Sequence, residues 1–180
     1  MTARAVIAVS AAQRPGAVGG SLRPATVADA GAIHALISRY QAEGRLLPRP
    51  DSEIAEHADR FLVIEEPRTG AVVACAELAP LSAEVAEVRS LVVHDEARGL
   101  GFARVLMETL GAEARLAGFR TLCAFTHEPG FFVRLGFSLV PHAWLPEKIA
   151  HDCAGCPLFR RCGQDAVRLE LSGSRRGLGA

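Results

Sequence analysis

The sequence predicts a mixed α/β fold, in which helices cover the faces of one sheet. Two apolar stretches joined by the turn "PRTG" predict a hairpin of two strands over residues 61–78. A Val-rich strand, a long amphipathic helix and another strand follow over residues 87–126. Helices, antiparallel strands and then a strand–helix–strand unit are the order of elements expected for a mixed sheet.

The first predicted helix covers residues 26–44. Thr26 and Asp29 form a capping box at its start, and Gly44 ends it. Between them, apolar residues recur at helical spacing: Ile33, Leu36, Ile37 and Tyr40. A proline-rich loop and a second short helix follow before the hairpin.

The strand over residues 87–93 is apolar on both faces near its end, which predicts burial on both sides. Gly118 closes the long helix after it. That helix carries an apolar stripe, formed by Ala103, Leu106, Met107, Leu110, Ala114 and Ala117. Further strands are expected at residues 119–126, 137–142 and 166–171, with a short helix over residues 128–136.

Length and composition predict one globular domain. The chain has 180 residues, of which 49% are hydrophobic and 22% charged. We expect a flexible extension over residues 1–20, the domain over 21–172 and a flexible tail over 173–180.

Charge and cysteine usage exclude several classes of protein. Lys+Arg and Asp+Glu are 20 each, so the chain lacks the basic surface of a general nucleic-acid binder. No apolar run approaches the ~20 residues that span a membrane. Five cysteines do not suggest a secreted disulfide framework. We therefore expect a cytoplasmic protein with small-molecule partners and no nucleic-acid or membrane partner. A homodimer is left open.

The segment Arg98-Gly99-Leu100-Gly101-Phe102-Ala103 carries the strongest chemical signal. It lies between a buried strand and the start of a long helix, where unpaired backbone N–H groups and the helix dipole favour a phosphate. A Walker loop is excluded because Phe102 and Ala103 replace its Lys-Ser/Thr pair, and a dinucleotide fingerprint because Arg104 replaces its third glycine. A helix-start turn without any ligand is the alternative.

The stretch "VRSLVVHDEARGLGFARVLM" resembles the acetyl-CoA motif of the GNAT N-acetyltransferases. Arg98, Gly101 and Ala103 occupy its defining positions, and "FFVRLGF" resembles the later signature of that family. The resemblance covers residues 22–171 and implies a mostly antiparallel sheet that splays at the acetyl-CoA site. It also implies that acetyl-CoA is the co-substrate, with no obligatory metal. In such proteins the backbone of the strand before the motif holds the pantetheine arm, and Leu91, Val92 and Val93 lie at that place in this sequence. The resemblance also implies that the amides of residues 98–104 hold the pyrophosphate.

More local features resemble the short, stand-alone N-acetylglutamate synthases of arginine biosynthesis. These features are "EGRLLPR", "SEI", "AEVRSL" and the ending "LPEKIAHDCAGCPLFRRC". The resemblance implies acetyl transfer to the α-amine of L-glutamate.

Glu87 is the candidate general base. It is charged within an apolar strand, so it needs a partner or a chemical role. An ammonium group cannot attack a thioester until it loses a proton, and a partly buried carboxylate can accept that proton. The alternative is a structural pair with Arg89. The resemblance implies that a Glu at this position is the base.

Thr126 is the second catalytic candidate. The resemblance implies a hydroxyl residue at this position, near the sulfur of the leaving CoA. The alternative for Thr126 is a threonine at the strand end that binds the backbone. His127 follows it and could act as a second base, but we favour a solvent-facing side chain.

A dicarboxylic amino acid needs cationic side chains to hold its carboxylates. The candidates for substrate binding are Arg49, Arg89 and Lys148, with Arg160 or Arg161 as further choices. We favour Arg49 for one carboxylate and Arg89 for shaping the site. A solvated surface charge is the alternative for each.

The segment "HDCAGCPLFRRC" contains a cluster of potential metal ligands. Zinc bound by His151, Cys153, Cys156 and Cys162 is one interpretation, and a disulfide is another. We favour reduced, partly buried thiols in a loop that covers the substrate site.

Two other functions remain open: acetylation of a different amine (a peptide N-terminus, a polyamine or an antibiotic), and a non-catalytic sensor of acetyl-CoA or an amino acid.

Overall fold

A computed structural model of the chain describes residues 7–9, 19–41 and 48–171. It confirms the mixed α/β fold and divides into two compact units. The first unit comprises Met1–Leu78 with Val88–Leu110, and the second comprises Ala79–Glu87 with Gly111–Ala180. Both are discontinuous because the strands β4 (Val72–Pro80) and β5 (Val85–Val93) and the helix α3 (Phe102–Leu116) each contribute residues to both.

The first unit contains strands in the order β1 (Ile7–Val9), β2 (Gly20–Pro24), β3 (Phe61–Glu65), β4 and β5. The described pairings of β1, β2, β3 and β4 are antiparallel. The β3–β4 hairpin is the one predicted, and its turn is closed by a hydrogen bond from the N–H of Gly70 to the carbonyl of Glu66 at 2.8 Å. Gly70 has φ 71° there, a conformation that favours glycine.

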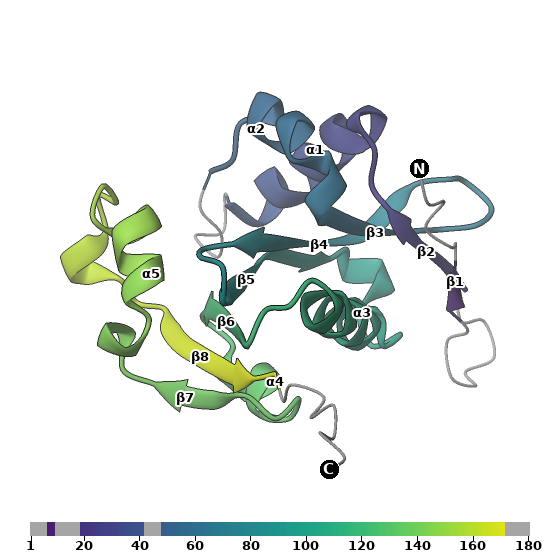
Figure 1. The fold of residues 1–180 in the computed structure, drawn as a ribbon. Helices are drawn as coiled ribbons and strands as arrows, with labels where there is room; N and C mark the ends of the chain where they lie inside the picture. The colour runs from purple at the N-terminus through teal and green to yellow at the C-terminus, as the bar shows by residue number, and fades with distance from the viewer. Residues whose placement is uncertain (1–6, 10–18, 42–47, 172–180) are drawn as a thin grey trace, which may run out of the picture. The chain divides into compact units, whose positions relative to one another are not determined.

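The helices α1 (Ala30–Gln41) and α2 (Asp51–Glu56) pack on one face of these strands (Figure 1). The capping box is present: the backbone N–H of Thr26 donates to the Asp29 carboxylate at 2.7 Å, just before a short 3₁₀ turn, η1 (Val27–Asp29). The stripe predicted on the first helix is fully buried. The core on this face is formed by Ile33, Leu36, Ile37, Tyr40, Ile54, Phe61, Val63, Cys75 and Val92, with Ala25 and Ala30.

The opposite face of the first unit is covered by the start of α3 (Figure 1). Gly20 is required at its position, because a Cβ there would lie 2.5 Å from the Ile64 side chain and 2.9 Å from the ring of Phe102. Most of the predicted stripe of α3 is buried, and Gly118 ends the helix with φ 90°. Ala103 is only half-buried, and Ala117, which lies just beyond the end of α3 at Leu116, is exposed.

The second unit contains strands in the order β4, β5, β6 (Thr121–Thr126), β8 (Asp165–Glu170) and β7 (Ser138–Val140), with the short helix α4 (Pro129–Val133). β6 runs parallel to β5, with Val85 opposite Thr121 and Glu87 opposite Cys123. This parallel pair follows from the strand–helix–strand order, because parallel neighbours need a crossover connection. Both pairings of β8 are antiparallel. The predicted splay between β5 and β6 stays a prediction.

The segment between β7 and β8 is built from short turns rather than a long loop. These are η4 (His142–Trp144), α5 (Pro146–Lys148), the π-helical turn η5 (Ile149–Cys153) and the 3₁₀ turn η6 (Phe159–Arg161). Leu145 anchors it to a small core with Val85, Cys123 and Ala166. Within the described ranges, no helix is long and apolar enough to cross a membrane.

The N-terminal segment differs from the expected flexible extension. Ile7–Val9 pair with β2, with Ile7 opposite Leu22, so part of residues 1–20 belongs to the sheet. β2 begins at Gly20, one residue before the predicted domain start. The expected tail over residues 173–180 and the expected helix end at Gly44 lie outside the described residues.

Candidate active site

The predicted acetyl-CoA loop lies in the first unit, between β5 and α3. Gly99 and Gly101 have φ 77° and 85°, so both adopt the left-handed conformation that brings consecutive amides toward one side. The N–H of Val105 donates to the carbonyl of Gly101 at 3.1 Å, which makes Gly101 the residue before the first helical turn. The amides of Phe102, Ala103 and Arg104 therefore have no acceptor within the helix. Phe102 is 1% exposed and fixes this turn to the core.

Two arginines add positive charge to the loop. Arg98 is half exposed, and its guanidinium lies 3.0 Å from the Asp95 carboxylate and 5.2 Å from the centre of the Tyr40 ring. Arg104 is more exposed and lies 3.9 Å from Glu108. Amides at a helix start together with exposed guanidinium groups fit a phosphate-containing ligand.

The strand before the loop is only partly available to a ligand. Val92 is buried in the core, and Leu91 and Val93 are half-buried. The Tyr40 hydroxyl donates to the carbonyl of Val93 at 3.2 Å. The pantetheine role predicted for these three residues stays a prediction.

Sequence reasoning missed a distortion in β5 at Ser90. Its φ of 50° is the one positive value of a non-glycine residue in the described parts of the chain. The Cys75 thiol donates to the Ser90 carbonyl at 3.5 Å, and Arg49 donates to its hydroxyl at 3.3 Å. Burial raises the pKa of Cys75 to about 12, so it remains a thiol. Such a residue inside a strand marks a bulge or a strained position, which often lies beside a functional site.

Arg49 is bound by acidic residues of its own unit. It pairs with Glu77, which is 1% exposed, and with Glu53 at 2.6 Å. Burial lowers the pKa of Arg49, but the two carboxylates raise it further, so the net direction is upward. Glu77 was missed although the signal was the same as for Glu87: a charged residue in an apolar strand. Arg89 is half-buried on β5 in the same unit.

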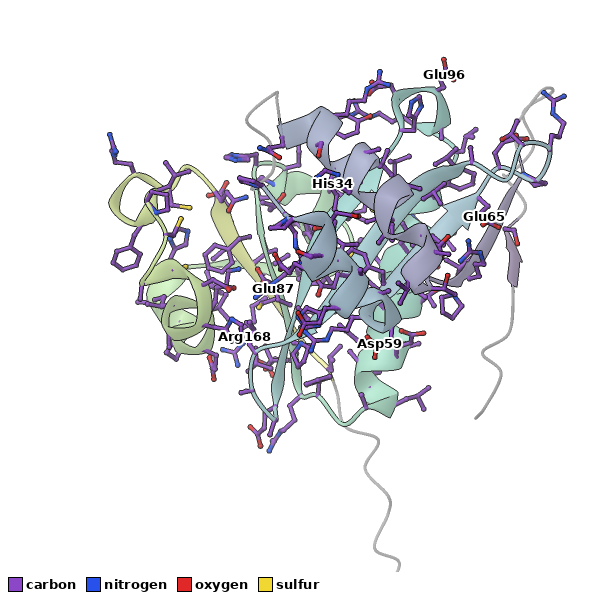
Figure 2. The ribbon with its side chains drawn as sticks, turned by 90° about the horizontal axis from the view of Figure 1, so that it is seen from above. His34, Asp59, Glu65, Glu87, Glu96 and Arg168 are labelled. Atoms are coloured by element: carbon purple, nitrogen blue, oxygen red, sulfur yellow. The ribbon has the colours of Figure 1, made fainter. Side chains whose placement is uncertain are left out.

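Glu87 and Lys148 are brought together in the second unit. Glu87, which is labelled in Figure 2, lies on β5 and is 2% exposed. The Lys148 ammonium lies 2.8 Å from each oxygen of the Glu87 carboxylate and 2.8 Å from the Asp152 carboxylate. It also lies 5.5 Å from the centre of the Phe125 ring.

Thr126 is placed on the other face of β6. Glu87 lies opposite Cys123, and side chains alternate along a strand, so Thr126 faces away from Cys123 and Glu87. Its hydroxyl accepts a hydrogen bond from the N–H of Glu128 at 2.9 Å, which is the alternative role considered from the sequence. The catalytic role of Thr126 stays a prediction. His127 is exposed, as expected.

The C-terminal cysteines are free and half-buried. Burial raises the pKa of Cys153 above its ordinary value. In the part of the chain that the structure describes, His151, Cys153, Cys156 and Cys162 do not form a group that could hold a metal ion.

Comparisons with known proteins identify the family. An uncharacterised N-acetyltransferase of Chlorobaculum tepidum is 34% identical over 146 residues, which cover 81% of this chain and 93% of the relative. A family model described as an acetyltransferase (GNAT) domain matches residues 57–139.

The chain belongs to the GNAT acetyltransferase family.

The chain is also similar to amino-acid acetyltransferases and to a solved N-acetylglutamate synthase. An amino-acid acetyltransferase of Salmonella typhi is 33% identical over 128 residues. The crystal structure of N-acetylglutamate synthase from Neisseria gonorrhoeae, complexed with coenzyme A and N-acetyl-glutamate, has 25% sequence identity and a TM-score of 0.76. These matches cover 70% and 85% of this GNAT chain, but 28% and 35% of the relatives. The chain thus spans about a third of their length.

Proposed function

We propose that this GNAT enzyme transfers the acetyl group of acetyl-CoA to the α-amine of an amino acid, with L-glutamate as the acceptor. Similarity to amino-acid acetyltransferases and to an N-acetylglutamate synthase supports this acceptor. The product would be N-acetylglutamate, which enters arginine biosynthesis.

The loop of the first unit would bind the pyrophosphate of acetyl-CoA. The amides of residues 99–104 would donate hydrogen bonds to it, and the Arg98 side chain would supply charge, whereas the Arg98 amide already donates to the carbonyl of Asp95 at 3.2 Å. Asp95 would orient Arg98, because it already holds the guanidinium at 3.0 Å. Bound acetyl-CoA supplies the thioester that the amine attacks.

Burial of Glu87 is the observation that carries the proposed chemistry. A carboxylate that is 2% exposed can bind the substrate ammonium, accept one of its protons and release a nucleophilic amine. Glu87 lies on β5, the strand that also carries Leu91, Val92 and Val93.

We propose that Arg49 and Arg89 bind the substrate carboxylates. Arg49 already pairs with two carboxylates, so its use for substrate requires an exchange of ion-pair partners. Lys148, the third candidate, is held by Glu87 and Asp152 and is not assigned to a substrate carboxylate.

Release of free CoA from acetyl-CoA in the presence of each of the twenty amino acids tests the proposal. We expect turnover with L-glutamate at least about tenfold above any other amino acid, because two carboxylate contacts distinguish it from neutral side chains. Turnover with a peptide N-terminus, a polyamine or an antibiotic but with no amino acid would contradict the proposal. Mass spectrometry of the product identifies which amine carries the acetyl group.

A further inference from the structure

Lys148 occupies a position in the second unit that is built to bind a primary ammonium. Both oxygens of Glu87 and one oxygen of Asp152 lie 2.8 Å from its nitrogen, and the face of Phe125 lies on a further side. Carboxylates and an aromatic face are the groups that bind ammonium ions in proteins. The Lys148 side chain is 12% exposed, so the interaction is largely shielded from water.

The α-ammonium of an amino acid carries the same group. An acceptor that uses Glu87 as its base must bring its ammonium against the carboxylate that Lys148 now contacts. The Lys148 ammonium lies 2.8 Å from both Glu87 oxygens, so it occupies the space between them and repels a second ammonium. Lys148 and the acceptor amine therefore compete for Glu87.

Asp152 provides a second position for Lys148. Residues 148 and 152 are four apart on one turn of helix, so their pairing does not depend on Glu87. The turn that joins them, Ile149–Cys153, is π-helical, a local irregularity that is frequent at functional sites. His151 also lies 2.9 Å from Asp152.

Lys148 keeps a carboxylate partner during the exchange. When a substrate ammonium binds Glu87, Lys148 can retain its contact with Asp152. The lysine is therefore not left as an unpaired buried charge, which would be costly.

We propose that Lys148 is an internal competitor of the acceptor amine and that Asp152 is the positioning residue that retains it when substrate binds. This inference rests on the proposed role of Glu87. It assigns a role to Asp152 and replaces the carboxylate-binding role of Lys148 with competition for Glu87.

Opposite effects on one kinetic constant test the proposal. With the amino acid that the screen identifies, Lys148→Met should lower the KM of the acceptor about fivefold, because the substrate no longer displaces a bound ammonium. Asp152→Asn should raise the same KM about fivefold, because Lys148 then loses its second partner. The double variant should follow Lys148→Met, since Asp152 acts only through Lys148. Glu147→Gln is the matched control on the same segment and should keep the wild-type KM.

Three results would overturn the proposal: a higher acceptor KM in Lys148→Met, a lower kcat at unchanged KM in that variant, or additive effects in the double variant. Thermal melts establish first that each variant folds. If Lys148→Met shows no cooperative melt, the acceptor KM of Asp152→Asn decides between support and rejection. A higher KM supports the proposal, and an unchanged or lower KM overturns it.

A second measurement does not depend on turnover. Lys148→Ala should be stabilised by methylammonium chloride, with the Tm rising about 3 °C above its value in equal tetramethylammonium chloride, whereas the wild-type protein shows no difference. Equal melting temperatures in the two salts would contradict an ammonium site. Stabilisation without acetylation of any amino acid would retain the ammonium site and reject the proposed function.

Discussion

At the scale of single residues, buried charge indicates where the chemistry lies. Glu87 could be singled out from the sequence because a carboxylate in an apolar strand requires a partner. Its pairing with Lys148 could not be predicted, since 61 residues separate the two positions and Lys148 lies in a segment of short turns without periodicity. Glu77 gives the same signal, but its pairing with Arg49 joins two positions 28 residues apart and is not visible in a local pattern.

Arg98 provides a residue-scale prediction for the acetyl-CoA loop. Arg98→Ala should raise the KM of acetyl-CoA about tenfold with kcat within about threefold, because one charge-assisted hydrogen bond to phosphate is lost. Steady-state kinetics with varied acetyl-CoA measures both constants.

Arg68→Ala serves as the control for Arg98→Ala. Arg68 is 90% exposed in the β3–β4 turn, so its loss should leave both constants unchanged. An unchanged KM in Arg98→Ala would remove this side chain from the binding of acetyl-CoA.

At the scale of elements, local sequence signals predicted several caps and turns, although α1 begins at Ala30 rather than at residue 26. The capping box before α1, the hairpin turn at Gly70 and the end of α3 at Gly118 follow from the conformational preferences of single residues. β1 was not predicted, because three residues are too few to show a strand period. The distortion at Ser90 has no sequence signal, since a non-glycine residue with positive φ is held there by its neighbours.

The network around Asp29 gives a prediction about acid stability. Hydrogen bonds from Arg23 lower the pKa of Asp29 from 3.8 to about 2, although burial opposes this shift. A carboxyl whose pKa is lower in the folded state stabilises the fold above its unfolded pKa. That stabilisation is lost as the pH falls from about 4 through about 2.

Asp29→Asn should therefore reduce the free energy of unfolding by about 1–3 kcal/mol at pH 7, and by less at pH 3. Urea denaturation at both pH values measures the difference. Glu96→Gln, at an exposed site, is the control. Equal destabilisation at the two pH values would show that the charge of Asp29 does not contribute.

At the scale of the whole molecule, the order of elements along the chain predicted the mixed α/β fold. The parallel pairing of β5 with β6 follows from the helix that connects them, and the antiparallel pairing of β3 with β4 follows from a short turn. The division into two compact units was not predicted, because β4, β5 and α3 each contribute to both and no linker separates them. Insertion of β8 between β6 and β7 depends on contacts distant in sequence.

The two sets of candidate residues are distributed between these units. The glycine loop and Arg49 belong to the first unit, and Glu87, Thr126 and Lys148 belong to the second. β5 contains both Glu87 and the residues that lead to the loop, so a single strand links the proposed base to the proposed acetyl-CoA site.

Comparison of Glu87→Gln with the wild-type enzyme tests the central claim most directly. The measurement is glutamate-dependent release of CoA at neutral pH, with the affinity for acetyl-CoA determined on the same samples. We predict a loss of rate of about 10²–10⁴-fold at unchanged acetyl-CoA affinity, because the amide cannot accept the proton of the ammonium. A rate within about threefold of the wild-type value would contradict the account and remove Glu87 from the mechanism.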